Sequence, residues 1–204
     1  KIKTKRKKPV INLPSARSGN QIRLFGDFRV TDNQENDITM MFTPKVKEFM
    51  LYILVYTMKN GNGALISEIN ENLWPGIPAG KVANNRAVTL NKLRKLLMQM
   101  EGIEIRVQNG FISAKMEKPF FCDFVEAYRL CTIKGEMTKQ QLETFFLLVK
   151  SGRFIKESEW PWLDEIRGLT GNQVIDNLLK LASVYKKEGN LEEIDDIAQR
   201  ILDY

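Results

Sequence analysis

Hydrophobic and polar positions follow one pattern up to about residue 118 and another beyond it. Apolar residues alternate with polar ones from Gln21 to Val30, which predicts a half-buried strand, and Asp37–Phe42 is a second short β-like run. Thr43 and Pro44 then form a helix start, with a hydroxyl at the N-cap and proline at the first helical position. The apolar spacing extends that helix to about Met58.

The next segment predicts two helices followed by a hairpin. The elements are a brief strand at 63–65, a short helix over Leu65–Leu73 with Ser67 as a candidate cap, a proline-containing loop at 75–78, a long helix at about 80–100, and strands Ile103–Val107 and Phe111–Ala114. Asn109-Gly110 joins the two strands, and this pair suits the positive φ angles of a type I′ turn. Two helices and a hairpin, the second helix long and basic, are the pattern of a winged helix-turn-helix.

Beyond Lys118 the sequence predicts helices only. Apolar residues recur at spacings of three and four over Asp123–Leu130, Thr138–Val149, Asp164–Lys187 and Leu191–Leu202. The short Glu188-Gly189-Asn190 turn suggests helical hairpins, although the segment is too short for three full repeats. We therefore expect an α+β protein with a basic arm or linker at 1–20, a winged helix with a small antiparallel sheet at 21–118, and an all-α, TPR-like domain at 119–204.

Charge is divided in the same way as the hydrophobic pattern. The net charge is +6, but residues 1–121 hold 20 Lys and Arg against 10 Asp and Glu, whereas residues 122–204 hold 11 against 15. A basic front and an acidic back predict a polyanionic partner for the first part only. The Lys- and Arg-rich residues 1–8 are either a basic arm or the cytoplasmic flank of a preceding membrane helix.

Composition argues against several classes of function. Histidine is absent, which removes His-based triads and His metal ligands, and no glycine-rich phosphate loop or pocket-forming carboxylate pair is recognisable. The two cysteines are too few for a zinc site and fit reduced, cytosolic thiols. We expect a cytoplasmic protein that is not an enzyme and has no catalytic residues, cofactor, metal or small-molecule substrate.

The long helix lies in a stretch without acidic residues, between Asn72 and Met100. At 100° per residue, one side is apolar and forms the expected core stripe of Ala83, Leu90, Leu93, Leu97 and Met100. The opposite side carries Lys81, Asn84, Asn85, Val88, Asn91, Lys92, Lys95 and Gln99. A merely solvated face usually carries glutamate as well, to form Glu–Lys pairs, so this mixture favours a DNA-facing surface.

Each side chain on this face suits a particular DNA contact. Asparagine can bond an adenine edge, lysine can bond guanine or phosphate, and valine methyls can contact thymine. We expect base contacts from Asn84, Asn85, Val88, Asn91 and Lys92, and phosphate contacts from Lys81, Arg94, Lys95 and Arg106. Gln108 and Asn109, at the tip of the hairpin beside Arg106, are further candidates as wing residues.

Three segments resemble the OmpR/PhoB-type winged-helix DNA-binding domain, in the variant found in SARP-type bacterial activators. They are TPKVKEFMLYILVYTMKNGNGALISEINENLWP from Thr43, NNRAVTLNKLRKLLMQM from Asn84 and IEIRVQNGFISA from Ile103. The family usually has Gly-x-Gly-Tyr where this chain has Asn109-Gly110-Phe111. Further along, CDFVEAYRL and the segment from Glu159 to Leu202 resemble the TPR-like bacterial transcriptional activation domain, so the resemblance spans residues 21–204.

The resemblance implies a transcription regulator that binds double-stranded DNA, with the helical domain used for regulation, homodimerisation or contact with a partner. It also implies that loop 74–80 contacts RNA polymerase, although two prolines that simply stiffen the loop explain it equally well. The alternative function is a protein-interaction module, in which a degenerate winged helix docks a protein and does not bind DNA.

Overall fold

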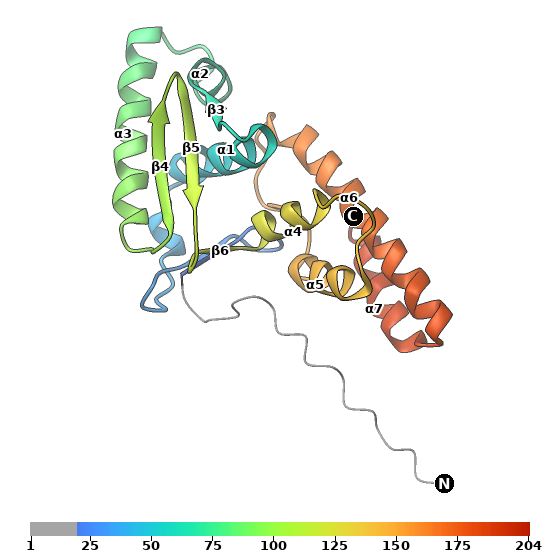
Figure 1. The fold of residues 1–204 in the computed structure, drawn as a ribbon. Coiled ribbons are helices and arrows are strands. Elements are labelled where there is room, and N and C mark those ends of the chain that lie inside the picture. The colour runs from blue at the N-terminus through green and yellow to red at the C-terminus, as the bar shows by residue number, and fades with distance from the viewer. Residues whose placement is uncertain (1–19) are drawn as a thin grey trace.

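The computed structural model describes residues 20–204, and their fold is of the α+β class (Figure 1). The strands are β1 (Gln21–Arg23), β2 (Arg29–Thr31), β3 (Ala64–Leu65), β4 (Ile103–Gln108), β5 (Phe111–Met116) and β6 (Phe121–Cys122). The helices are the 3-10 helix η1 (Thr39–Met41) and α1 (Pro44–Asn60), α2 (Ile66–Leu73), α3 (Ala79–Leu97), α4 (Asp123–Cys131), α5 (Lys139–Val149), α6 (Leu163–Glu188) and α7 (Leu191–Leu202). The basic arm expected at 1–20 lies outside the described residues except for Asn20.

The expected strand over Gln21–Val30 is wrong in its extent, because the chain turns between β1 and β2. Gly26 in this turn has φ of 80°, and a Cβ there would lie 2.5 Å from the main-chain oxygen of Ser151. Close approach of the 150–155 loop thus requires glycine and interrupts the strand. The β-like run expected at Asp37–Phe42 is likewise the 3-10 helix η1, with only a single bridge between Thr31 and Asp37.

The expectation of helices only beyond Lys118 is also wrong. β6 pairs in parallel with β1, with Ile22 opposite Cys122, and the sheet order is β2-β1-β6. The first sheet is therefore mixed rather than antiparallel, and it joins the helical part to the first strands. Asn20 belongs to the same junction: it is buried, and its side chain bonds the main-chain O and N of Glu101, both at 2.7 Å.

The second sheet, of order β3-β5-β4, is antiparallel and packs with α1 and α3. Figure 1 shows α3 running alongside the β4–β5 hairpin, with α1 crossing behind it. α1 is buried over most of its middle, and Phe49, Met50 and Ile53 are fully enclosed. Because α1 contacts α2, α3, β3 and β5, it determines where the exposed face of α3 points.

α1 also holds the start of α6 through a buried polar contact. The indole Nε1 of Trp162 donates to Glu48 Oε1 at 3.2 Å, and its ring meets Tyr52 edge-on at 4.9 Å. The other Glu48 oxygen accepts from Lys45 Nζ at 2.6 Å, and Lys45 also donates to the carbonyl of Leu73 at the end of α2. α1, the end of α2 and the residue that precedes α6 thus share one hydrogen-bonded network, which disfavours their separation.

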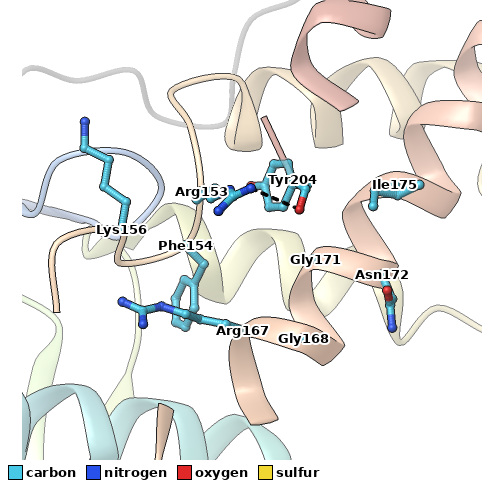
Figure 2. Close-up of a pocket in the computed structure, with 9 residues that line it drawn as sticks. All are labelled: Arg153, Phe154, Lys156, Arg167, Gly168, Gly171, Asn172, Ile175 and Tyr204. Atoms are coloured by element: carbon cyan, nitrogen blue, oxygen red, sulfur yellow. Dashed lines mark hydrogen bonds between the residues drawn. The ribbon is translucent and has the colours of Figure 1, made fainter. Parts of the chain in front are cut away.

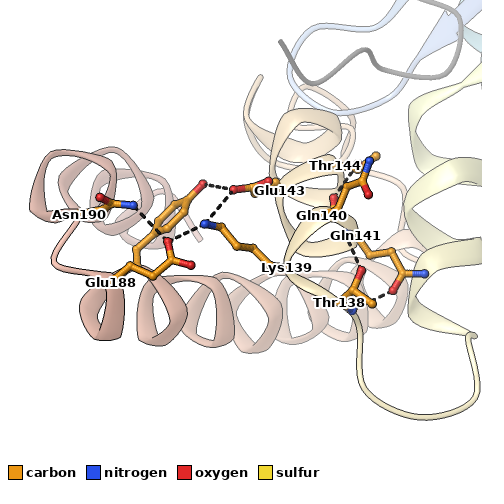
Figure 3. Close-up of polar contacts among 9 residues, drawn as sticks. Thr138, Lys139, Gln140, Gln141, Glu143, Thr144, Glu188 and Asn190 are labelled. Atoms are coloured by element: carbon orange, nitrogen blue, oxygen red, sulfur yellow. Dashed lines mark hydrogen bonds and ion pairs between the residues drawn. The ribbon is translucent and has the colours of Figure 1, made fainter. Parts of the chain in front are cut away.

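The four helices expected beyond residue 122 are confirmed to within about one residue at each end. α5 begins with a capping box, in which the Thr138 hydroxyl accepts from the Gln141 amide and the Gln141 side chain accepts from the Thr138 amide (Figure 3). Figure 3 also shows the ion pair between Lys139 and Glu188, with Nζ and Oε2 2.5 Å apart, which links the start of α5 to the end of α6. None of the described helices combines the length and apolar character that crossing a bilayer would require.

Asp123 connects α4 to β1. Its carboxylate accepts the main-chain N–H groups of Leu24 at 2.8 Å, Phe25 at 3.1 Å and Phe124 at 2.7 Å, and the side chain is buried. Burial raises the pKa of Asp123 to about 7, although the three N–H donors oppose the rise. The folded protein therefore binds a proton here at pH values where the unfolded chain, with an ordinary carboxyl, does not.

Asp123 makes the stability of the fold depend on pH in an unusual direction. Between about pH 5 and pH 7 the folded state takes up a proton that the unfolded state lacks, so the free energy of unfolding should rise as the pH falls, by up to about 1.4 kcal/mol per pH unit. The chain has no histidine to titrate in that window. Urea denaturation at several pH values measures the slope. Asp123→Asn should abolish this dependence of the free energy of unfolding on pH. An equal slope in that variant would show that Asp123 does not cause the dependence.

Candidate nucleic-acid interface

α3 buries one stripe of side chains, but it is rotated slightly from the one expected. Val82, Thr89, Leu93 and Leu97 are buried, whereas Ala83 is exposed and Leu90 only half-buried. Thr89 can be buried because its hydroxyl donates to the carbonyl of Asn85 at 2.7 Å, which satisfies the polar group within the helix. A stripe chosen by hydrophobicity alone misses such a residue.

Most of the expected DNA-facing residues do lie on the exposed side of α3. Lys81, Asn84, Val88, Asn91, Lys92, Arg94 and Lys95 are all exposed. Val88 is 44% exposed although it is aliphatic, which places its methyl groups at the surface. Asn85 and Gln99 are half-buried at the edge of the packed side, so Asn85 is less accessible than Asn84 and Asn91.

Within residues 20–204, none of the eleven ion pairs involves a residue of α3. Lys81, Lys92 and Lys95 therefore have no carboxylate partner there. Arg86 donates to the neutral side chain of Asn70 on α2, at 2.6 Å. Among residues 20–204 the lysines of α3 thus have no acidic partner, whereas cations on other elements, such as Lys45 and Lys139, are paired with acids.

Arg94 has a structural contact that the sequence did not reveal. Its Nε and Nη2 donate to the carbonyl oxygen of Ile105, at 3.3 and 3.0 Å, which ties α3 to the edge strand β4. Arginine has five N–H groups, so three remain for another acceptor. The sequence-based hypothesis of a phosphate contact thus applies to a side chain that is already held against the sheet.

The β4–β5 turn has the expected conformation. Asn109 and Gly110 have φ of 51° and 79°, as a type I′ turn requires. The carbonyl of Gly110 accepts from the amide of Ile66 at 2.9 Å, which fastens the tip of the hairpin to the start of α2. Gln108 and Asn109 are exposed, but they stay close to the helices instead of projecting on a long wing.

Arg106, also on the hairpin, is exposed but paired with Glu104 at 3.0 Å. An exposed pair is weak, yet it places a negative charge beside the candidate phosphate contact. Of the residues expected to bind DNA, those on α3 are therefore better placed than those on the hairpin.

The segment before α3 differs from expectation at one point. Ser67 does not cap α2, because the helix begins at Ile66 with Leu65 at the N-cap position. Ile69 and Leu73 face the core as expected, and Trp74 is buried against Phe49 with their ring centroids 5.9 Å apart. The residues from Pro75 to Gly80 are exposed, and the last two of them already belong to α3, so Trp74 is the buried residue of the described segment 74–80.

The last turn of α3 is less open than the rest. The carbonyl of Gln99, just beyond the helix, accepts from the amide of Asn33 at 3.1 Å, so the 32–36 loop lies against this end. The uncovered part of the helix runs from Lys81 to Lys95 and joins three lysines to two exposed asparagines and Val88.

Comparisons with protein-family models, with curated proteins and with solved structures gave no significant match to this chain.

Loss of the Arg94 contact should weaken the fold. Arg94→Ala removes two hydrogen bonds between α3 and β4, and we expect the free energy of unfolding to drop by about 1 kcal/mol. Chemical denaturation measures the drop. Lys92→Ala, one of the exposed unpaired cations, is the matched control and should leave stability nearly unchanged. Equal stability of both variants would show that the Arg94 contact contributes nothing.

Proposed function

We propose that the chain is a DNA-binding transcription regulator that inserts α3 into the major groove. The observation that carries the proposal is the exposed face of a 19-residue helix with several cations and no carboxylate partner among the described residues. A helix of this length spans about 28 Å, and the major groove, about 12 Å wide, admits an α-helix. Polyanionic DNA is the partner that an uncompensated basic helix face attracts most strongly.

In this proposal the face divides into base contacts and phosphate contacts. Asn84, Asn91 and Lys92 meet base edges, and Val88 lies against a thymine methyl group. Lys81 and Lys95 bind phosphates on either side, and Arg94 adds its remaining N–H groups. Asn85 is a peripheral base contact, because it is half-buried. Asparagine pairs with adenine and valine with the thymine methyl, so the groove that fits best contains A·T pairs.

The order of elements supports a winged helix of the OmpR/PhoB type. α2, a proline-containing loop, α3 and an antiparallel hairpin follow one another. Arg106, Gln108 and Asn109 would be its wing, short because the turn is fastened to α2. α4 to α7 form the TPR-like part, for which we propose regulation, homodimerisation or partner contact. A contact of the 74–80 loop with RNA polymerase would use Ile77, which is 38% exposed, rather than the buried Trp74.

Replacing Asn84, Asn91 and Lys92 together by Ala should lower affinity for a specific duplex while leaving non-specific binding less affected. Each well-made bidentate base contact contributes about 1–3 kcal/mol of discrimination, so the loss in specific affinity should be at least about tenfold. Fluorescence anisotropy with a selected duplex and with a scrambled one measures both quantities. Unchanged affinity of the triple variant for the selected duplex would refute the base contacts.

Lys95→Ala should weaken binding to every sequence by a similar factor and flatten the salt dependence. Loss of one phosphate contact changes the slope of log K against log salt by about 0.9. Lys180→Ala, which removes an exposed lysine from α6, is the control and should change neither affinity nor slope. A Lys95→Ala slope identical to that of the Lys180→Ala variant would contradict the phosphate contact. Salt-insensitive binding of a protein, with no affinity for DNA, would instead support the interaction-module alternative.

A further inference from the structure

A cavity of about 330 Å³ lies in the helical part of the protein, between the loop that follows α5 and the first half of α6 (Figure 2). Arg153, Phe154 and Lys156 line it from the loop. From α6 it is lined by Arg167, Gly168, Gly171, Asn172 and Ile175. Tyr204 covers part of it, with its hydroxyl bonded to the carbonyl of Gly152 at 2.9 Å. No residue of α3 lines the cavity, so the cavity is separate from the proposed DNA contacts.

The lining is cationic. Arg153, Lys156 and Arg167 all contribute, and no Asp or Glu is among the described residues that line the cavity. Two of these cations have an acidic neighbour: Asp27 lies 2.7 Å from Lys156, and Asp164 lies 3.7 Å from Arg167. Both carboxylates are largely exposed, so solvent weakens the pairing and the lining stays positive.

The two guanidinium groups retain donors for a ligand. Arg153 bonds the main-chain oxygens of Asp203 and Tyr204, and Arg167 bonds those of Ile155 and Ser158. Each arginine thus uses two of its five N–H groups on main-chain oxygens and keeps three. These contacts fix the two side chains in place, and the remaining N–H groups can form charged hydrogen bonds to an anion.

Two glycines on α6 border the cavity. A Cβ at Gly168 would meet no atom within 4 Å, and one at Gly171 would only touch the Tyr204 ring, at 3.4 Å. Neither glycine has a positive φ, since both lie in a regular helix, where glycine costs up to about 1 kcal/mol relative to alanine. The wall of the cavity at Gly168 is therefore open and not closely packed.

We propose that this cavity binds a small molecule that carries a phosphate group. Three cations without an acid in the lining favour a dianion over a monoanion, and a planar guanidinium matches the oxygen atoms of phosphate. The volume is at the low end of the range for ligand sites, about 300–1,000 Å³, so the ligand is a small phosphate ester or pyrophosphate rather than a dinucleotide. The 153–156 loop also bonds the β1–β2 turn, through the amides of Gly26 and Ile155, so the ligand would contact the loop that joins the helical part to the first sheet.

Isothermal titration of the full chain with inorganic pyrophosphate tests the proposal, at about 0.15 M salt so that unspecific attraction is screened. We expect saturable binding with one site per chain. Gly168→Leu should abolish it, because the new side chain projects into the cavity, and Arg153→Gln should weaken it about tenfold through loss of a charged hydrogen bond. Lys150→Gln is the matched control: it removes an exposed cation at the end of α5, outside the cavity, and should bind like the parent.

Absence of saturable binding would overturn the proposal, as would equal binding by all three variants. Equally tight binding of malonate, a dicarboxylate, would overturn the assignment to phosphate. Circular dichroism melting of each variant separates lost binding from lost folding. If Arg153→Gln unfolds, Gly168→Leu still decides, since it introduces a better helix former where the structure has open space. Unfolding of Gly168→Leu would contradict the description of that wall as open.

Discussion

The carboxylate of Asp123 is the contact on which the two parts of the molecule depend. It accepts the main-chain N–H groups of Leu24 and Phe25, which follow β1, and that of Phe124 in the first turn of α4. One buried side chain thus links β1 to α4, next to the place where β6 pairs with β1. Burial of this carboxyl group has a cost, which its raised pKa reflects, and the three N–H groups offset part of that cost. The helical part is thereby attached through the sheet and not through a flexible linker.

A second attachment runs through α1. On one side of α1, Glu48 and Tyr52 contact Trp162. On the other side, α1 packs against α3 and the β3-β5-β4 sheet. The same helix therefore supports both the basic face of α3 and the entrance of α6. Such an arrangement couples the proposed DNA-facing surface to the helical part by rigid packing, because helix, indole and carboxylate form one buried cluster.

Much of the secondary structure could be predicted from periodicity and turn chemistry. The extents of α1 and α7, the strand at Ala64–Leu65 and the Asn109-Gly110 turn follow from local signals such as proline at a helix start or paired positive-φ residues. The two misses in the first sheet share one physical cause, which is contact between segments distant in sequence. β6 is a strand only because β1 lies beside it, and the break at Gly26 exists because the loop near Ser151 approaches its backbone.

The candidate interface was predictable to a similar degree. Helical geometry placed Asn84, Asn91 and Lys95 on the exposed side, but it could not anticipate that Thr89 would bury its hydroxyl or that Arg94 would bond β4. Local sequence does not show which carboxylates lie near a cation. The Glu104–Arg106 pair, and the lack of ion pairs on α3 within the part of the chain that the structure describes, therefore emerge only from the fold. The cationic cavity in the helical part left no signal in the sequence either, since its arginines lie on a loop and a helix that meet only after folding.

An amide NMR titration of the full chain with a duplex DNA of mixed sequence tests whether α3 binds DNA. We expect chemical-shift changes to concentrate between Lys81 and Lys95, to extend weakly to the 108–110 turn, and to leave α6 and α7 unperturbed. These changes should diminish as salt is raised, because phosphate contacts release counterions. Changes centred on the helical part, or no changes at low salt, would contradict the claim that α3 is a DNA-binding helix.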